Sequence, residues 1–357
     1  MEFYLLKAWT TKRKSFTKKQ FSLLNKFIKR TAKASELSLA TDWSSLNMGD
    51  FRFIEKTPTK SLQFMVGYER GLSQIERQNC TTLYSYKGDK YSFRAITYYK
   101  DIFVSFTDEY TQVHRDGEII WKSKQYISHG RNKYAHLCEA QLYFVDWNNT
   151  LLHLDLDQLL IKIANGISKN SDIKIYDKNV KDVAIHSKPQ LVVYMKSDAK
   201  GITTVFCAKK PICQTQTSGA SFACIAKFNK YVALGGCKKD KETGTYQGIL
   251  ELVTDHGDNL SCQTFKLYDH HEDQIAVIRM FKVFAHVFVA AMRFHQNLDI
   301  YAIYNDELIT ITSIKTLNDT KNAKIWHRDM KVVSKSACNT ELIIVTDKKL
   351  ITVSFKV

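Results

Sequence analysis

After Gly49 the sequence consists mostly of short hydrophobic runs separated by short polar segments. Residues 101–122 show the pattern: a hydrophobic run, a polar turn, a second run, an Asp-Gly pair and a third run. Asp116-Gly117 predicts a tight hairpin turn, because such turns need a positive φ, which glycine adopts freely and aspartate tolerates. Variants of this unit recur along most of the chain and predict a protein built mainly from β-strands.

The spacing of one polar residue narrows the fold class. An aspartate that follows a hydrophobic run recurs at Asp108, Asp146, Asp198, Asp240, Asp306 and Asp347. Three of the five spacings lie near the roughly 40–45 residues of a four-stranded propeller blade. The 52-residue spacing before Asp198 includes residues 155–164, which we expect to form an inserted helix, whereas the 66-residue spacing before Asp306 fits neither one blade nor two. Among sandwiches, barrels and propellers, the pattern favours an all-β propeller of seven blades of about 45 residues each, with six or eight blades as alternatives.

A ring of blades has to close on itself. The last hydrophobic runs, residues 342–346 and 350–355, leave the final blade one strand short. We expect residues 3–6 or 37–40 to supply the missing strand, because pairing the two ends of the chain removes an exposed sheet edge.

Residues 1–45 differ from the predicted propeller of residues 46–357. Thr17-Lys18-Lys19-Gln20 matches a capping box, and hydrophobic residues follow it at helical spacing. We therefore predict a basic N-terminal arm that contains an amphipathic helix of about four turns. Its hydrophobic face either docks on the propeller, which we favour because tertiary packing stabilises most helices, or binds a partner groove, an acidic lipid surface or nucleic acid.

The charge of the chain is concentrated in this arm. Of a formal net charge of +16, nine charges lie in the first 34 residues, where ten Lys and Arg residues accompany Glu2 alone. This asymmetry indicates either an anionic partner or a solvated tail that aids solubility. If the arm binds a partner, the contacts are expected at Lys12, Arg13, Lys14, Lys18, Lys19, Phe21, Leu24, Lys26, Phe27, Ile28, Lys29 and Arg30.

A second candidate surface interleaves aromatic and basic residues. Bases stack on aromatic rings and cations follow phosphates in single-stranded nucleic-acid sites. The residues of this kind are Tyr84, Tyr86, Lys87, Lys90, Tyr91 and Arg94. The alternative, which we favour, is strand alternation, with the aromatic side chains in the core and the cations facing solvent.

The eight cysteines contain no C-x-x-C pair, and several lie inside hydrophobic runs, as at Cys207 and Cys224. They are expected to be small buried residues in a reducing compartment. No hydrophobic run reaches the roughly 18 residues of a membrane span, and no secretory signal is apparent. These features predict an intracellular protein of the cytoplasm or nucleus.

Few residues suggest chemistry. The polar segments 255–258 and 269–273 contain three His and five Asp or Glu residues, which favour either a transition-metal site or, more simply, two solvated turns. The phosphate-binding motif G-x-x-x-x-G-K, the nucleophile motif G-x-S-x-G and the zinc motif H-E-x-x-H do not occur. We therefore predict no catalytic residues, no metal and no cofactor.

The residue pattern from 50 to 357 resembles that of the WD-repeat β-propeller superfamily. The segments ending in Trp121-Lys122 and Trp326-His327 resemble the strand that ends in Trp-Asp in that family, although Trp-Asp itself does not occur. Residues 231–236 resemble the small-residue strand before the family's Asp-Gly turn. Either Asp108-Glu109 or Asp116-Gly117 corresponds to that turn, and the first choice places Trp121 in an outer strand. The resemblance implies the fold and identifies no functional residue.

These observations predict a non-catalytic scaffold or adaptor that joins other protein subunits in an intracellular complex. The alternative is a nucleic-acid- or ribonucleoprotein-binding module that uses the arm and the basic, aromatic surface. A weaker hypothesis is an enzyme that uses the carboxylates and histidines of residues 255–273.

Overall fold

The computed structural model covers the chain in segments. The residues it describes are 22, 26, 33–36, 51–56, 63–68, 71–76, 79–85, 93–124, 135–167, 172–187, 190–215, 217, 220–255, 260–266, 274–283, 286–293, 297–315, 327–336, 339–346 and 350–356.

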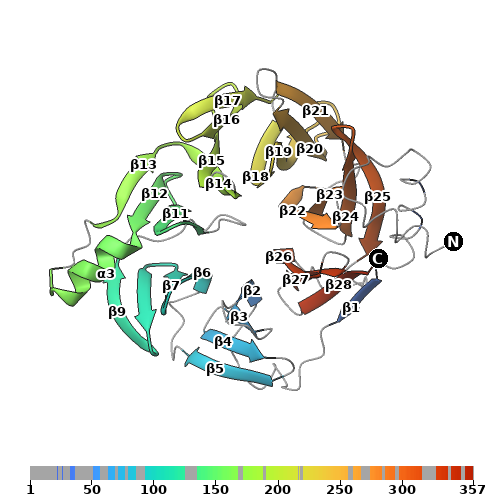
Figure 1. Ribbon diagram of the computed structural model, residues 1–357. Coiled ribbons are helices and arrows are strands. Elements are labelled where there is room, and N and C mark those ends of the chain that lie inside the picture. Colours follow the sequence, from blue (N-terminus) through green and yellow to red (C-terminus); the bar gives the residue numbers. More distant parts are fainter. Residues whose placement is uncertain are drawn as a thin grey trace.

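The described strands form seven four-stranded antiparallel sheets, the blades, arranged as a ring around a common central axis (Figure 1). In each blade the first strand is innermost. Blades 1 to 3 contain β2 Phe51–Lys56, β3 Gln63–Tyr68, β4 Gly71–Glu76 and β5 Asn79–Ser85; β6 Phe93–Tyr99, β7 Ile102–Thr107, β8 Thr111–Arg115 and β9 Glu118–Ser123; and β10 His136–Cys138, β11 Gln141–Val145, β12 Leu151–Asp155 and β13 Lys174–Asp177.

Blades 4 to 7 continue in chain order, so the prediction of seven blades is confirmed. Their strands are β14 Val180–Ser187, β15 Gln190–Ser197, β16 Thr203–Cys207 and β17 Lys210–Gln214; β18 Ala220–Phe228, β19 Tyr231–Lys239, β20 Tyr246–Asp255 and β21 Leu260–Lys266; β22 Ile275–Val283, β23 His286–Arg293, β24 Asn297–Tyr304 and β25 Glu307–Lys315; and β26 His327–Ser336, β27 Asn339–Thr346 and β28 Leu350–Lys356, completed by β1 Lys33–Glu36.

The ring closes in blade 7, where strands from the two ends of the sequence lie side by side (Figure 1). β1 pairs antiparallel with β28, with Lys33 opposite Ser354 and Glu36 opposite Ile351. An N-terminal strand, β1, thus completes blade 7, whereas the segments named in the prediction, residues 3–6 and 37–40, lie outside the described residues. The sequence Lys-Ala-Ser-Glu shows no hydrophobic alternation, so the free edge of β28, rather than a local pattern, determines this strand.

Hydrophobic clusters lie between neighbouring blades. Phe106 of blade 2 packs on Phe144 of blade 3 with ring centroids 4.9 Å apart, and Phe281 of blade 6 packs on Phe355 of blade 7 at 5.5 Å. Cys138, Cys207, Cys213, Cys224 and Cys237 are free thiols, and Cys138, Cys224 and Cys237 are buried, as expected for small core residues. Burial raises the pKa of Cys213 to about 12, so this thiol stays protonated at neutral pH.

Four of the recurring aspartates, Asp108, Asp146, Asp198 and Asp240, are turn residues between the second and third strands of their blades. Asp146 Oδ1 accepts from the backbone N–H groups of Asn148 and Thr150 at 2.9 and 2.8 Å, and Asp198 and Asp240 stabilise their turns in the same way. Asp306 instead lies between the third and fourth strands of blade 6. The 66-residue spacing therefore compares two different turns.

Two local predictions are confirmed near blades 2 and 3. Asp116 and Gly117 form the β8–β9 turn with φ values of 49° and 85°, so Trp121 lies in the outer strand β9 and Asp108 occupies the repeated turn. Helix α3, Leu156–Ala164, is inserted between β12 and β13, and Asp155 caps it by accepting from Gln158 N at 2.9 Å. Asp157 of α3 binds Tyr99 Oη at 2.9 Å and Lys100 Nζ at 2.6 Å, which attaches the helix to blade 2.

Candidate interaction surfaces

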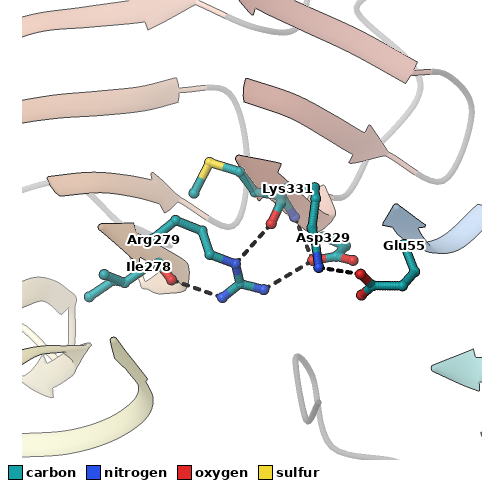
Figure 2. A network of polar contacts seen from close by, with 6 residues as sticks. Glu55, Ile278, Arg279, Asp329 and Lys331 are labelled. Carbon is teal, nitrogen blue, oxygen red and sulfur yellow. Dashed lines mark hydrogen bonds and ion pairs between the residues drawn. The ribbon is translucent and has the colours of Figure 1, made fainter. Parts of the chain in front are cut away.

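The innermost strand of each blade has one backbone edge with no neighbouring strand, and it faces the axis of the ring; polar side chains bond to part of this edge in blades 6 and 7. Arg279 of β22 donates from Nη1 to the carbonyl of Ile278 and from Nε to the carbonyl of Met330, each at 2.9 Å (Figure 2). Its Nη2 donates to Asp329 Oδ1 at 3.3 Å. A single guanidinium therefore links the inner edges of blades 6 and 7.

The next contact continues this network across the join between the last and first blades. Lys331 Nζ of β26 donates to Glu55 Oε1 of β2 at 2.5 Å (Figure 2). Both side chains are partly exposed, at 31% and 26%, so solvent screens this pair and we assign it about 1 kcal/mol or less. Arg279, Asp329, Lys331 and Glu55 form what we call the central network. Its two cations and two carboxylates neutralise one another.

His136, at the start of β10, lies within the electrostatic range of these cations. Burial lowers the pKa of His136 to about 3, and the charges of Arg279 and Lys331 act in the same direction. The imidazole is therefore neutral at physiological pH. Among the described residues, no group of three or more His, Cys, Asp or Glu side chains is arranged to hold a metal ion.

Blades 4 and 5 are also joined by a charged side chain that bonds to a backbone group of the neighbouring blade. Asp182 of β14 is buried, and its Oδ2 accepts from the backbone N–H of Ile225 in β18 at 3.0 Å. Within blade 6, the buried Arg293 makes a bidentate ion pair with Asp299, at 2.6 and 3.0 Å. Buried charge in these parts of the ring thus joins strands and blades.

The antiparallel topology gives the ring two different faces. The second-to-third-strand turns and the connections between blades share one face, which we call the Asp-turn face; the remaining turns form the opposite face. On the opposite face several cations are neutralised within the chain. Lys100 pairs with Asp157, Arg115 with Asp101 and Lys230 with Asp306, at 2.6–2.7 Å.

The predicted nucleic-acid residues fall mostly outside the described part of the chain. Tyr86, Lys87, Lys90 and Tyr91 lie outside it, and Tyr84 lies in β5. Arg94 of β6 makes a bidentate ion pair with Asp108, with Nη2 and Oδ2 3.0 Å apart, so its guanidinium is engaged inside blade 2. A surface formed by all six residues therefore stays a prediction.

The predicted N-terminal arm is described only at Ser22 and Lys26, which are both helical and exposed. The other predicted contact residues lie outside the described residues: Lys12, Arg13, Lys14, Lys18, Lys19, Phe21, Leu24, Phe27, Ile28, Lys29 and Arg30. In the predicted metal region, Asp255 ends β20, is exposed, and donates its backbone N–H to the carbonyl of Lys230 at 2.9 Å. The remaining candidate metal ligands lie outside the described part as well.

The central network was not predicted from the sequence. Its residues are distributed over β2, β22 and β26, and pairs such as Glu55 and Lys331 are 276 positions apart. A weak signal exists, because Arg279 interrupts the otherwise hydrophobic run of residues 275–281. A charge in such a position indicates a specific partner.

Comparisons with known proteins identify the fold. No protein-family model matches the chain, and no curated protein matches it. Among solved structures, a chain of the mitotic checkpoint complex is 10% identical, with a TM-score of 0.60 and 91% of each chain covered. The WD40 β-propeller domain of Doa1 is 13% identical, with a TM-score of 0.55 over 89% of this chain and 96% of that one.

The fold is that of the WD-repeat β-propellers. A chain from the structure of S. cerevisiae Dbp5 bound to Nup159, Gle1, IP6 and ADP shares it, with 10% identity and a TM-score of 0.60 over 91% of this chain and 96% of that one. In this seven-bladed propeller, no helix within the described residues has the length and apolar character needed to cross a bilayer.

Proposed function

We propose that this propeller is a non-catalytic scaffold that holds protein partners within a larger assembly. The main observation that supports this proposal is the central network. Arg279, Asp329, Lys331 and Glu55 bind one another and the inner strand edges, so these central charges stabilise the ring. Binding is then expected on the turns and the rim, where a rigid ring presents groups from several blades at fixed positions.

The similar structures support the proposal through the shared fold. The mitotic checkpoint complex and the structure of Dbp5 with Nup159 and Gle1 are multi-protein assemblies by their names. A propeller suits such a role because its blades are held between neighbours, so its surface changes little on binding.

Affinity purification from the native source, after nuclease treatment and at two salt concentrations, tests the proposal. We expect one or more proteins to remain bound in stoichiometric amounts, and cross-linking mass spectrometry should place them on the turns or rim. A monomer that co-purifies with no other protein under either condition would contradict a scaffold function.

A second function is supported by the charge of the N-terminal arm, where nine of the sixteen excess positive charges lie. We propose nucleic-acid binding by this arm as the alternative. Deletion of residues 1–30 removes nearly all of this charge and leaves β1 intact, so a loss of salt-sensitive nucleic-acid binding is attributable to the arm. Unchanged binding, or none at low salt, would remove the alternative.

A further inference from the structure

The Asp-turn face carries an excess of unneutralised positive charge over blades 2 to 5. Within the described residues, seven exposed lysines lie there, and none forms an ion pair with a described carboxylate: Lys122, Lys124, Lys178, Lys181, Lys200, Lys239 and Lys241. The exposed carboxylates of the same turns are Glu109, Asp198 and Glu242, and Asp198 already accepts two backbone N–H groups of its own turn. On the opposite face Lys100, Arg115 and Lys230 are paired with carboxylates, whereas Lys174, Lys210 and Lys282 are exposed and form no ion pair with a described carboxylate.

Two exposed aromatic side chains lie among these lysines. Trp147 is 56% exposed and Tyr246 is 46% exposed, and both belong to the Asp-turn face, in blades 3 and 5. They are the aromatic members of the exposed large hydrophobic residues in the described part of the chain. Large aromatic side chains exposed to solvent indicate a binding surface, because Trp and Tyr are enriched among the hot-spot residues of protein interfaces.

The turns fix this arrangement. The Asp146 carboxylate holds the turn that presents Trp147, because it accepts from the backbone N–H groups of Asn148 and Thr150. The backbone N–H of Val180 donates to the carbonyl of Asn149 at 2.7 Å, which places the connection bearing Lys178 and Lys181 against the Trp147 turn. In blade 5 the Lys239 ammonium lies 5.9 Å from the centre of the Tyr246 ring.

We propose that this surface, the Asp-turn face of blades 3 to 5, binds an acidic segment of a partner protein that also carries hydrophobic side chains. The lysines attract the carboxylates of the segment, while Trp147 and Tyr246 contact its hydrophobic side chains at either side of blade 4. The inference rests on the proposed scaffold function and names the chemistry of one partner.

A protein segment fits the surface better than a nucleic acid does. A nucleic acid carries a phosphate at every nucleotide, so a strand that follows this face passes the exposed carboxylates of Asp198 and Glu242 and is repelled by them. A peptide is free to place its acidic residues against the lysines and other residues against those carboxylates.

Selection of peptides on the intact protein tests the inference. Random displayed peptides of about 16 residues, which reach about 50 Å when extended, span several blades. We expect the recovered peptides to be more acidic than the starting library and to contain aromatic or aliphatic residues. A recovered pool with no enrichment in Asp and Glu would overturn the inference.

Binding of the recovered peptides to two charge-matched variants then locates the site. K178E/K181E/K200E changes the Asp-turn face, and K174E/K210E/K282E makes the same change in net charge at exposed lysines near the opposite face. The first variant should weaken binding roughly 10- to 100-fold and the control less than about threefold. W147A should weaken it about tenfold or more, and all variants should keep the wild-type melting temperature within a few degrees.

Equal losses in both triple variants would indicate general charge attraction and overturn the assigned site. An oligothymidylate probe that binds more tightly than the peptides and is lost in K178E/K181E/K200E would overturn the choice of a protein partner. Neither result affects the scaffold function, which fails only if native purification yields no bound protein.

Discussion

Replacement of Arg279 by methionine tests whether the hydrogen bonds of the central network hold the blades together. The guanidinium donates at 2.9 Å to two carbonyls on the inner edges of blades 6 and 7, and at 3.3 Å to Asp329. Methionine has a similar length and no donor, so the Arg279→Met variant loses all three bonds and retains much of the side-chain volume.

The structure sets the size of the expected effect. Asp329 is buried, and breaking a hydrogen bond of a buried group costs about 1–3 kcal/mol. The Arg279 side chain is 21% exposed, so water replaces part of what is lost, and we expect a total of about 2–4 kcal/mol. In a chain of this size 1 kcal/mol corresponds to roughly 2 °C, so the melting temperature should fall by about 4–8 °C.

Thermal melts followed by far-ultraviolet circular dichroism measure this change. Lys331→Met is the matched control, because it breaks the partly exposed pair with Glu55 in the same network and should cost about 1 kcal/mol or less. An Arg279→Met variant that melts within about 2 °C of the wild type, or no lower than the control, would refute the reasoning.

Three further predictions concern the stability of the ring. Deleting residues 1–38 removes β1 and should lower the melting temperature and cause aggregation through the free edge of β28. Deleting residues 1–30 leaves β1 in place and should have neither effect. Thermal melts and size-exclusion chromatography measure the two effects. Gly236→Ala should cost about 3 kcal/mol or more, because its Cβ would lie 2.1 Å from a backbone oxygen, whereas Gly235→Ala meets only side chains and should cost less in chemical denaturation. Burial lowers the pKa of His114 to about 4, so unfolding becomes easier as the pH falls from about 6.5 to 4, and His114→Gln should flatten this dependence in melts.

The sign of the pH effect follows from proton binding. The unfolded chain, with an ordinary histidine pKa near 6.5, binds more protons between pH 6.5 and 4 than the folded chain does, so acid favours unfolding in this window. Below about pH 4 both states are protonated, and the loss reaches about 3 kcal/mol for this residue. A variant with the same pH dependence as the wild type would contradict the assignment to His114, and so would a wild type whose stability does not change over this window.

Sequence patterns identified the local features of the fold and missed those that depend on distant pairing. The hairpin at Asp116-Gly117 and the number of blades follow from turn chemistry and repeat length. Asp306 gave the irregular 66-residue spacing, because it lies in a turn between the third and fourth strands. Asn305 and Asp306 have φ values of 50° and 64° there, and the turn uses the same residue types as the second-to-third-strand turns. A single sequence does not separate two turns that use the same residue types.

The interaction surface was less accessible from the sequence than the fold. The prediction placed the basic partner surface in the N-terminal arm, where lysines are adjacent in sequence. The lysines of the Asp-turn face are spread from Lys122 to Lys241 in separate turns, and only the ring brings them to one face. Trp147 carried a recognisable signal, since a tryptophan in a polar turn has no reason to be there for packing alone.

The pairing of β1 with β28 has a consequence for synthesis on the ribosome. β1 is translated more than 300 residues before the strand that it pairs with. At the usual 5–20 residues per second, the first strand of the chain waits about 15–60 s for its partner. Until the seven residues of β28 are translated, β1 lacks its partner strand, and an unpaired strand edge of this kind favours aggregation.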